Sequence, residues 1–134
     1  MTAQNAPDFP HQTTIPVIRT IAMPHDTNPA GDIFGGWLMA QMELAAGNVA
    51  ARHARGRCAT IAVDGMVFHS PVKVGDEVTC YADVASVGRT SMRIKIEAWR
   101  RARDSEEAKQ VTEAMFTFVA IYAEGRPRLV APAS

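Results

Sequence analysis

The chain has 134 residues, of which 47% are hydrophobic and 21% are charged, as in an ordinary globular domain. This length supports one domain with a single hydrophobic core and argues against long-range disorder. The 14 basic and 14 acidic side chains give a formal net charge of zero, so the chain lacks the overall positive field that holds nucleic-acid phosphates.

The first residues, 1–14, are polar and contain two prolines, which predicts a flexible N-terminal arm without a signal peptide. Residues 15–127 form the expected single domain, followed by a C-terminal tail at 128–134, and the stretch "GRPRLVAPAS" is expected to be loose. No apolar run approaches the length of a membrane span. The two cysteines, Cys58 and Cys80, lack CxxC spacing, which favours small buried thiols. We therefore expect a cytoplasmic protein without membrane contact.

A predicted strand at 16–23 is followed by a loop at 24–36 that is dense in proline and glycine. Residues 37–54 are rich in Ala, Leu and Met and contain no proline, which is typical of a helix. Its polar residues are few, and three of them share one narrow stripe: Gln41, Asn48 and Arg52. A helix so apolar should be buried on most of its sides. Gly56 is the expected C-terminal cap.

After the helix the hydrophobic pattern changes to the period of strands. Strands are predicted at 58–68, 77–87, 92–98 and 111–122, with tight turns between most of them and a charged connection before the last. One long apolar helix and an antiparallel meander predict an α+β fold, in which a five-stranded antiparallel sheet wraps around the central helix. The open edges of such a sheet can be covered by pairing two subunits.

Several common catalytic motifs are absent from the sequence. It has no P-loop, no dinucleotide-binding glycine motif, no HExxH pair and no GxSxG nucleophile elbow. The four histidines, at positions 11, 25, 53 and 69, are scattered, and no His or Cys pair has metal-ligand spacing. His69 and Ser70 are adjacent on a predicted strand and should point to opposite faces, which argues against a nucleophilic pair. We therefore expect no metal and no separate cofactor.

The stretch "NPAGDIFGGW" (28–37) places one carboxylate, Asp32, between a glycine turn and the start of the apolar helix. Gly35 and Gly36 lie at or just before the first helical turn, where backbone N–H groups lack partners within the helix and carry partial positive charge. Such groups can stabilise negative charge on an acyl oxygen, and a nearby carboxylate can activate water or attack directly. On the residues alone a second interpretation stays open, in which Asp32 is only an N-cap and the glycines only turn the chain.

Four stretches resemble the YciA-type acyl-CoA thioesterases, a family with the hotdog fold. They are "MPHDTNPAGDIFGGWLMAQME" (23–43), "VDGMVFHSPVKVGDEV" (63–78), "GRTSMRIKIEAW" (88–99) and "TEAMFTFVAI" (112–121). The resemblance covers about residues 18–127. It implies a hotdog fold that hydrolyses acyl-CoA to a free acid and coenzyme A, with no cofactor apart from the coenzyme A of the substrate.

The same resemblance implies the catalytic residues. Asp32 matches the family's catalytic carboxylate, and Asn28 matches an asparagine expected to orient the acid or a water. Gly35 and Gly36 match the glycines that open the helix, and we expect their N–H groups to polarise the thioester carbonyl.

Two further groups are implied to bind substrate across a dimer. In hotdog dimers the second strand pairs with its symmetry mate, so three residues at its end lie near the dimer seam and its thioester tunnel: Asp64, Gly65 and Met66. The hairpin turn resembles one that contacts coenzyme A in the site of the partner subunit: Arg89, Thr90 and Ser91.

The chain departs from many family members at two places. Ala30 stands where many members have Asn, which should alter loop packing. His69 and Ser70 stand where many have Leu-Arg, which removes a positive charge that could meet a phosphate of coenzyme A. Four arginines could supply this charge instead, although a charged run after a strand is usually a solvated face: Arg93, Arg100, Arg101 and Arg103.

The resulting prediction is an acyl-CoA thioesterase that works as a dimer, with a hexamer built as a trimer of dimers, and that binds neither nucleic acid nor membrane. Two alternatives stay open: a hotdog protein that binds acyl-CoA or an acyl carrier without hydrolysis, and a hotdog dehydratase or hydratase that uses His25 with an acid. The chain-length preference depends on the blind end of the tunnel, which four apolar residues could close: Trp37, Met42, Met66 and Phe68.

Overall fold

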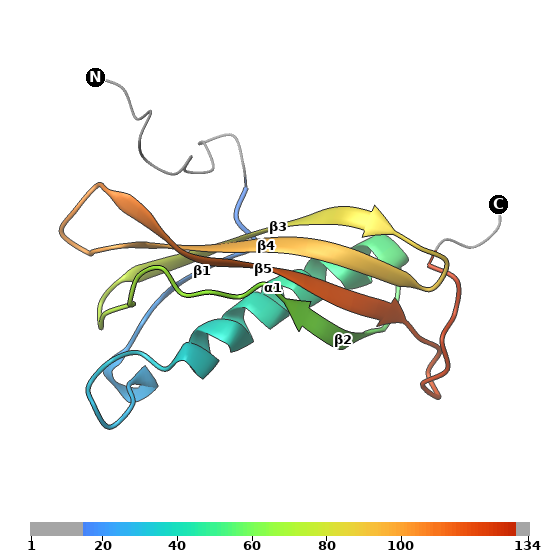
Figure 1. Ribbon diagram of the computed structural model, residues 1–134, viewed down its shortest axis with the longest axis horizontal. Helices are drawn as coiled ribbons and strands as arrows, with labels where there is room; N and C mark the ends of the chain where they lie inside the picture. The colour runs from blue at the N-terminus through green and yellow to red at the C-terminus, as the bar shows by residue number, and fades with distance from the viewer. Residues whose placement is uncertain (1–14, 131–134) are drawn as a thin grey trace, which may run out of the picture.

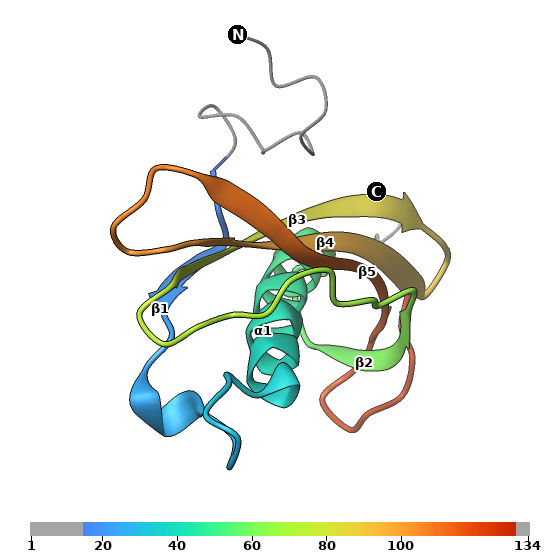
Figure 2. The same cartoon turned by 60° about the vertical axis from the view of Figure 1, so that its left-hand side comes forward.

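The computed structural model describes residues 15–130, so the predicted N-terminal arm and the last four residues lie outside the described part of the chain (Figure 1). Five strands, one short 3₁₀-helix and one long α-helix follow in the order β1 (Ile18–Ile21), η1 (Pro24–Asp26), α1 (Gly35–Ala54), β2 (Cys58–Asp64), β3 (Glu77–Val87), β4 (Ser91–Arg101) and β5 (Ala108–Ala120). The strands form one antiparallel sheet in the order β1-β3-β4-β5-β2. The sheet curls around α1 (Figure 2), which confirms the predicted fold.

Helix α1 begins at Gly35, two residues before the predicted start at 37. The side chains that it buries recur at helical spacing and are mostly small, so the sheet can approach its axis closely: Leu38, Met42, Ala45, Ala46, Ala50 and Ala54. The predicted burial on most sides is wrong for a single chain, because Met39 and Leu44 are 40% and 63% exposed on the uncovered side. Within residues 15–130, no helix is both long and apolar enough to cross a membrane.

The end of α1 differs from the prediction that Gly56 is the cap. Arg55 takes the left-handed conformation there, with φ of 55°, and its N–H donates to the carbonyl of Ala51. Position 56 instead requires a glycine because it has no room for a side chain: a Cβ there would lie 2.5 Å from Nη2 of Arg128. That same Nη2 donates to the carbonyl of Ala54 at 2.8 Å, so the Arg128 guanidinium satisfies the end of the helix.

Several predictions about the strands and the stretches beside them are wrong. Strand β2 ends at Asp64, because Gly65 turns the chain with φ of +72°, and the segment 65–76 then crosses α1 (Figure 2). Strands β4 and β5 extend into the connection that was expected to be solvated, which leaves only 102–107 between them. The C-terminal stretch is held as far as Val130, which is 2% exposed and donates its N–H to the carbonyl of Arg89.

Cys80 lies in the core on β3 with no exposed surface, as the sequence predicted, whereas Cys58 is only partly buried; neither forms a disulfide. Burial raises the pKa of the Cys80 thiol to about 12. The pKa of Cys58 is also raised by partial burial, although the nearby Arg128 charge opposes this. The reactive thiolate of Cys80 is therefore scarce at neutral pH.

We expect that a disulfide reagent at pH 8 leaves Cys80 unmodified in the folded protein and modifies it rapidly after denaturation. The measurement is absorbance on addition of an aromatic disulfide to a Cys58→Ala variant, in which Cys80 is the remaining thiol. Rapid stoichiometric reaction of the folded variant would show that the core around β3 is open to solvent.

Candidate active site

The loop between η1 and α1 is built around Asn28. Its Oδ1 accepts the N–H groups of Ala30 and Asp32 at 2.9 and 3.1 Å, and its own N–H donates to the carbonyl of Asp32 at 2.7 Å. Gly31, with φ of +88°, completes the turn by donating to the carbonyl of Asn28. Asn28 therefore holds the backbone of Asp32 in place, a more specific arrangement than the predicted contact with the acid or a water.

The carboxylate of Asp32 does not cap the helix. The N-cap residue is Phe34, and no side chain caps the helix start. Two residues separate Asp32 from the helix, because Ile33 forms an isolated bridge with Thr27 and is buried in the core. The interpretation of Asp32 as a simple N-cap is therefore wrong. Its side chain is 52% exposed, and Oδ1 lies 3.4 Å from Nζ of Lys73.

Gly35 and Gly36 form the first turn of α1, as predicted. The first hydrogen bond along the helix is donated by Leu38 to the carbonyl of Phe34, so the N–H groups of both glycines precede the helical ladder. Both residues are exposed. Their N–H groups also lie at the positive end of the helix dipole. A carbonyl oxygen that becomes negatively charged is favoured at this position.

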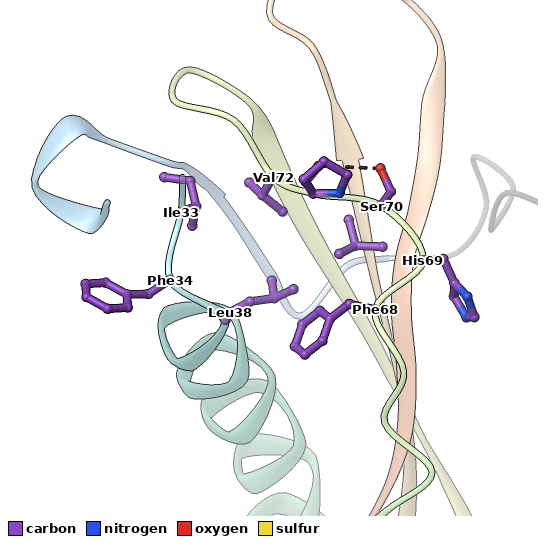
Figure 3. Close-up of a pocket in the computed structure, with 10 residues that line it drawn as sticks. Ile33, Phe34, Leu38, Phe68, His69, Ser70 and Val72 are labelled. Carbon is purple, nitrogen blue, oxygen red and sulfur yellow. Dashed lines mark hydrogen bonds between the residues drawn. The ribbon is translucent and has the colours of Figure 1, made fainter. Parts of the chain in front are cut away.

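An apolar pocket of about 360 Å³ lies beside this helix start (Figure 3). Its two walls come from the start of α1 and from the segment after β2: Ile33, Phe34, Gly35 and Leu38 on one side, and 68–72 with Val111 on the other. His69 points away from the pocket in Figure 3, and the hydroxyl of Ser70 accepts a hydrogen bond from Nε of Arg100 at 3.1 Å. The two residues therefore do not form a nucleophilic pair, as expected.

His25, the residue of the dehydratase alternative, lies beside the carboxylate of Asp26. Its Nε2 is 3.3 Å from Oδ1 of Asp26, and its side chain is 80% exposed. Asp32 instead pairs with Lys73. Among residues 15–130, no group of three His, Cys, Asp or Glu side chains is arranged to hold a metal ion.

One residue of the candidate site, Lys73, was missed by the sequence analysis, and the contacts of another, Arg100, differ from the prediction. Lys73 is the only lysine or arginine in the family-like stretch 63–78, and this could have drawn attention to it. Arg100 was considered only for phosphate binding, but its Nη1 lies 2.9 Å from Oδ2 of Asp76, and this pair is largely buried. Oδ2 of Asp76 also accepts the N–H of Lys73 at 2.8 Å. This network fixes the segment that presents Lys73 to Asp32.

The other predicted binding residues lie elsewhere in the single chain. Asp64 and Gly65 border a shallow pocket at the end of β2, and Asp64 lies 3.9 Å from Arg93. Met66 packs against the core. The turn 89–91 lies at the end of the sheet near the C-terminus of α1, whereas Asp32 precedes its N-terminus (Figure 1). A helix of 20 residues separates these two ends by about 30 Å, so one chain does not bring them together.

Comparison with known proteins places this chain in a family. The profile of the thioesterase superfamily matches residues 30–106. An uncharacterised acyl-CoA thioester hydrolase of Zymomonas mobilis is 53% identical over 117 residues, which cover 87% of this chain and 78% of that protein. The acyl-CoA thioester hydrolase YciA of Escherichia coli is 50% identical over 115 residues, covering 84% and 87%.

Solved structures agree with the sequence comparison. The crystal structure of a hexameric thioesterase from Yersinia pestis has 45% sequence identity and a TM-score of 0.85, and the match covers 92% of this chain and all of that one. The predicted resemblance is thus confirmed over most of the chain. The protein belongs to the thioesterase superfamily and has the hotdog fold of the YciA-type acyl-CoA thioester hydrolases.

Proposed function

We propose that this thioester hydrolase cleaves acyl-CoA with water activated by Asp32, while the N–H groups of Gly35 and Gly36 hold the thioester carbonyl. One observation carries the proposal: the carboxylate of Asp32 is free of any capping role and lies beside an uncapped helix start and an apolar pocket. Two relatives that are 50% and 53% identical to this chain are acyl-CoA thioester hydrolases, which supports acyl-CoA as the substrate.

The reaction follows from these positions. Asp32 removes a proton from water as the oxygen attacks the thioester carbon, and the helix-start N–H groups stabilise the negative charge that develops on the carbonyl oxygen. Collapse of the tetrahedral intermediate breaks the C–S bond. The thiolate of coenzyme A leaves and receives the proton held by Asp32, so the products are a free acid and coenzyme A.

A second route uses Asp32 as the nucleophile. Its carboxylate would displace the thiolate and form a mixed anhydride, which water then hydrolyses. The two routes differ in where oxygen from solvent is found. Water can attack either carbonyl of the anhydride. When it attacks the carbonyl of Asp32 in ¹⁸O-water, ¹⁸O remains in the peptide that contains Asp32, whereas the general-base route never labels this peptide. Label in this peptide after repeated turnover therefore identifies the anhydride route.

The active unit that we propose is a dimer formed along β2. Among residues 15–130, this strand is an edge of the sheet and pairs only with β5. Its Ile61 and Val63 side chains are 59% and 39% exposed, and Leu44 of α1 is 63% exposed. Pairing β2 with its symmetry mate continues the sheet and covers these apolar groups. A dimer also allows the turn 89–91 of one subunit to serve the site of the other, as the resemblance implies.

We further propose that three dimers form a hexamer. The thioesterase from Yersinia pestis is described as hexameric, which supports this assembly. The free thiols of the described chain fit a reducing compartment, and we propose the cytoplasm. The reaction needs acyl-CoA and water, and we propose no metal, cofactor, nucleic acid or membrane as a partner. Light scattering at micromolar concentration tests the assembly, and a monomeric protein would contradict both dimer and hexamer.

Hydrolysis itself is tested by thiol release. We expect the purified protein to release free thiol from a series of acyl-CoA substrates, at rates that depend on chain length. A protein that binds these compounds, as shown by calorimetry, but releases no thiol from any of them would favour the non-catalytic alternative. Holding the protein in a chelating buffer during the assay is expected to leave the rate unchanged, and a loss of activity there would contradict the proposal that no metal is needed.

A further inference from the structure

Asn28 holds the backbone of Asp32 but not its carboxylate. The hydrogen bonds between these residues end on the main chain of Asp32, whose N–H donates to Oδ1 of Asn28 and whose carbonyl accepts the N–H of Asn28. The carboxylate turns about two side-chain bonds that these contacts leave unrestrained. Its Oδ1 lies 3.4 Å from Nζ of Lys73, a residue 41 positions farther along the chain. The contact that restrains the carboxylate is therefore the one with Lys73.

Lys73 begins a tight turn at 73–76 that is fixed to the sheet. Its N–H donates to Oδ2 of Asp76 at 2.8 Å, and the N–H of Asp76 donates to the carbonyl of Lys73 at 3.0 Å. Asp76 is buried, and its own carbonyl accepts the N–H of Ala22, just after β1, at 3.0 Å. The backbone of Lys73 is therefore held as firmly as that of Asp32.

The segment that leads to this turn is attached to β5. The hydroxyl of Thr112 donates to the carbonyl of Val67 at 2.7 Å, and the N–H of His69 donates to the carbonyl of Val111 at 2.7 Å. Thr112 and Val111 are fully buried, so these bonds are shielded from water. Because the backbone is already fixed on both sides of the ion pair, forming the pair costs only the freedom of two side chains.

We propose that Lys73 is a positioning residue for the reaction: it holds Oδ1 of Asp32, so that Oδ2 accepts the proton of the attacking water. The inference rests on the function proposed above. A carboxylate takes a proton through one oxygen, so a cation on the other oxygen selects one orientation of the base and raises the fraction of productive encounters. Arg100 does not serve this purpose, because its guanidinium is bound by Asp76 and Ser70.

A different role for Lys73 would be to bind a phosphate of coenzyme A, since the chain lacks a positive charge at Ser70. The geometry disfavours this role, because a phosphate would have to share the ammonium group with a carboxylate 3.4 Å away that repels it. The two roles predict different kinetics. Loss of a positioning contact lowers kcat, whereas loss of a contact with bound substrate raises KM.

The test is thiol release from the acyl-CoA substrate that the unaltered protein hydrolyses fastest. Lys73→Met keeps an unbranched side chain without the charge, and it should lower kcat about fivefold, on the scale of an exposed ion pair, with KM unchanged. Lys73→Arg restores a cation and should recover most of kcat. The matched control is Lys109→Met, because the side chains of Lys73 and Lys109 are 58% and 56% exposed and Lys109 pairs with Glu107 at 3.9 Å. This control should retain the full kcat.

Asp32→Asn and the double variant with Lys73→Met separate the two proposals. Without the carboxylate Lys73 has nothing to orient, so the double variant should be no slower than Asp32→Asn alone. The positioning role would be overturned by an unchanged kcat in Lys73→Met, by a higher KM alone, by a loss that Lys73→Arg does not recover, or by a lower midpoint of urea unfolding. Retained hydrolysis in Asp32→Asn contradicts the proposed function itself, whereas lost hydrolysis there with full kcat in Lys73→Met contradicts this inference alone.

Discussion

Asp32→Asn is expected to lower kcat for thioester hydrolysis by about 10²–10⁴-fold, the range that a positioned general base contributes. The amide keeps the size of the carboxylate but does not accept a proton from water, and as a nucleophile it is equally ineffective. The substitution should leave the fold intact, because the side chain is 52% exposed and the side chain of its partner Lys73 is exposed as well. The measurement is thiol release at saturating acyl-CoA, with circular dichroism to verify folding.

The matched control is Asp83→Asn, which removes the same charge from an exposed position on β3, away from the helix start. It should retain the full rate, which excludes an effect of net charge alone. Binding of coenzyme A should be similar in the control and in Asp32→Asn, because the proposed role of Asp32 is in the chemical step. Hydrolysis by Asp32→Asn within a few-fold of the unaltered protein would rule out Asp32 as base or nucleophile.

The fold could be predicted from the sequence because its elements have clear periodicities. The alternation of Val78, Cys80 and Ala82 places one face of β3 against the helix, and these residues belong to or pack on the core. The other face of β3 carries Thr79 and Tyr81, and these side chains are also buried. Period alone does not reveal what covers the second face of a strand.

The site could be predicted only in part. Asp32, Gly35 and Gly36 are local to one stretch of sequence, so the helix rules of capping and dipole were sufficient to place them together. Lys73 reaches Asp32 from 41 residues away, and this contact depends on how the segment after β2 crosses the helix. That crossing begins at Gly65, where the sequence pattern favoured a continuing strand. Contacts between residues so far apart in the sequence depend on the tertiary fold and leave no pattern in the local sequence.

The C-terminal stretch shows the same limit. Its composition, with two prolines and two arginines close together, favours a loose tail. In the structure the Arg128 guanidinium donates to the carbonyls of Ala54 and Ile121, and this fixes the stretch against the end of α1. The sequence does not show whether an arginine is solvated or caps a helix. The difference depends on where the end of the helix lies in the fold.

Arg100→Met is expected to destabilise the protein by about 3–5 kcal/mol, because it leaves the buried carboxylate of Asp76 without its cation. The side chains of Arg100 and Asp76 are only 18% and 5% exposed, and the pair is 2.9 Å apart. Loss of the guanidinium also frees the hydroxyl of Ser70, so the pocket wall at 68–72 loses an anchor. The measurement is the free energy of unfolding in urea, with a lower denaturation midpoint and an unchanged slope.

The matched control is Arg126→Met. Its guanidinium lies 2.7 Å from the carboxylate of Glu124, which is a shorter distance than in the buried pair, but the two side chains are 71% and 56% exposed. The hydrogen bond from Arg126 lowers the pKa of Glu124, yet water solvates either group when the other is removed, so the denaturation midpoint should not change. In the double variant Arg100→Met with Asp76→Asn, most of the lost stability should return, because no unpaired charge is then buried. Equal effects of Arg100→Met and Arg126→Met would show that burial does not decide the strength of these pairs.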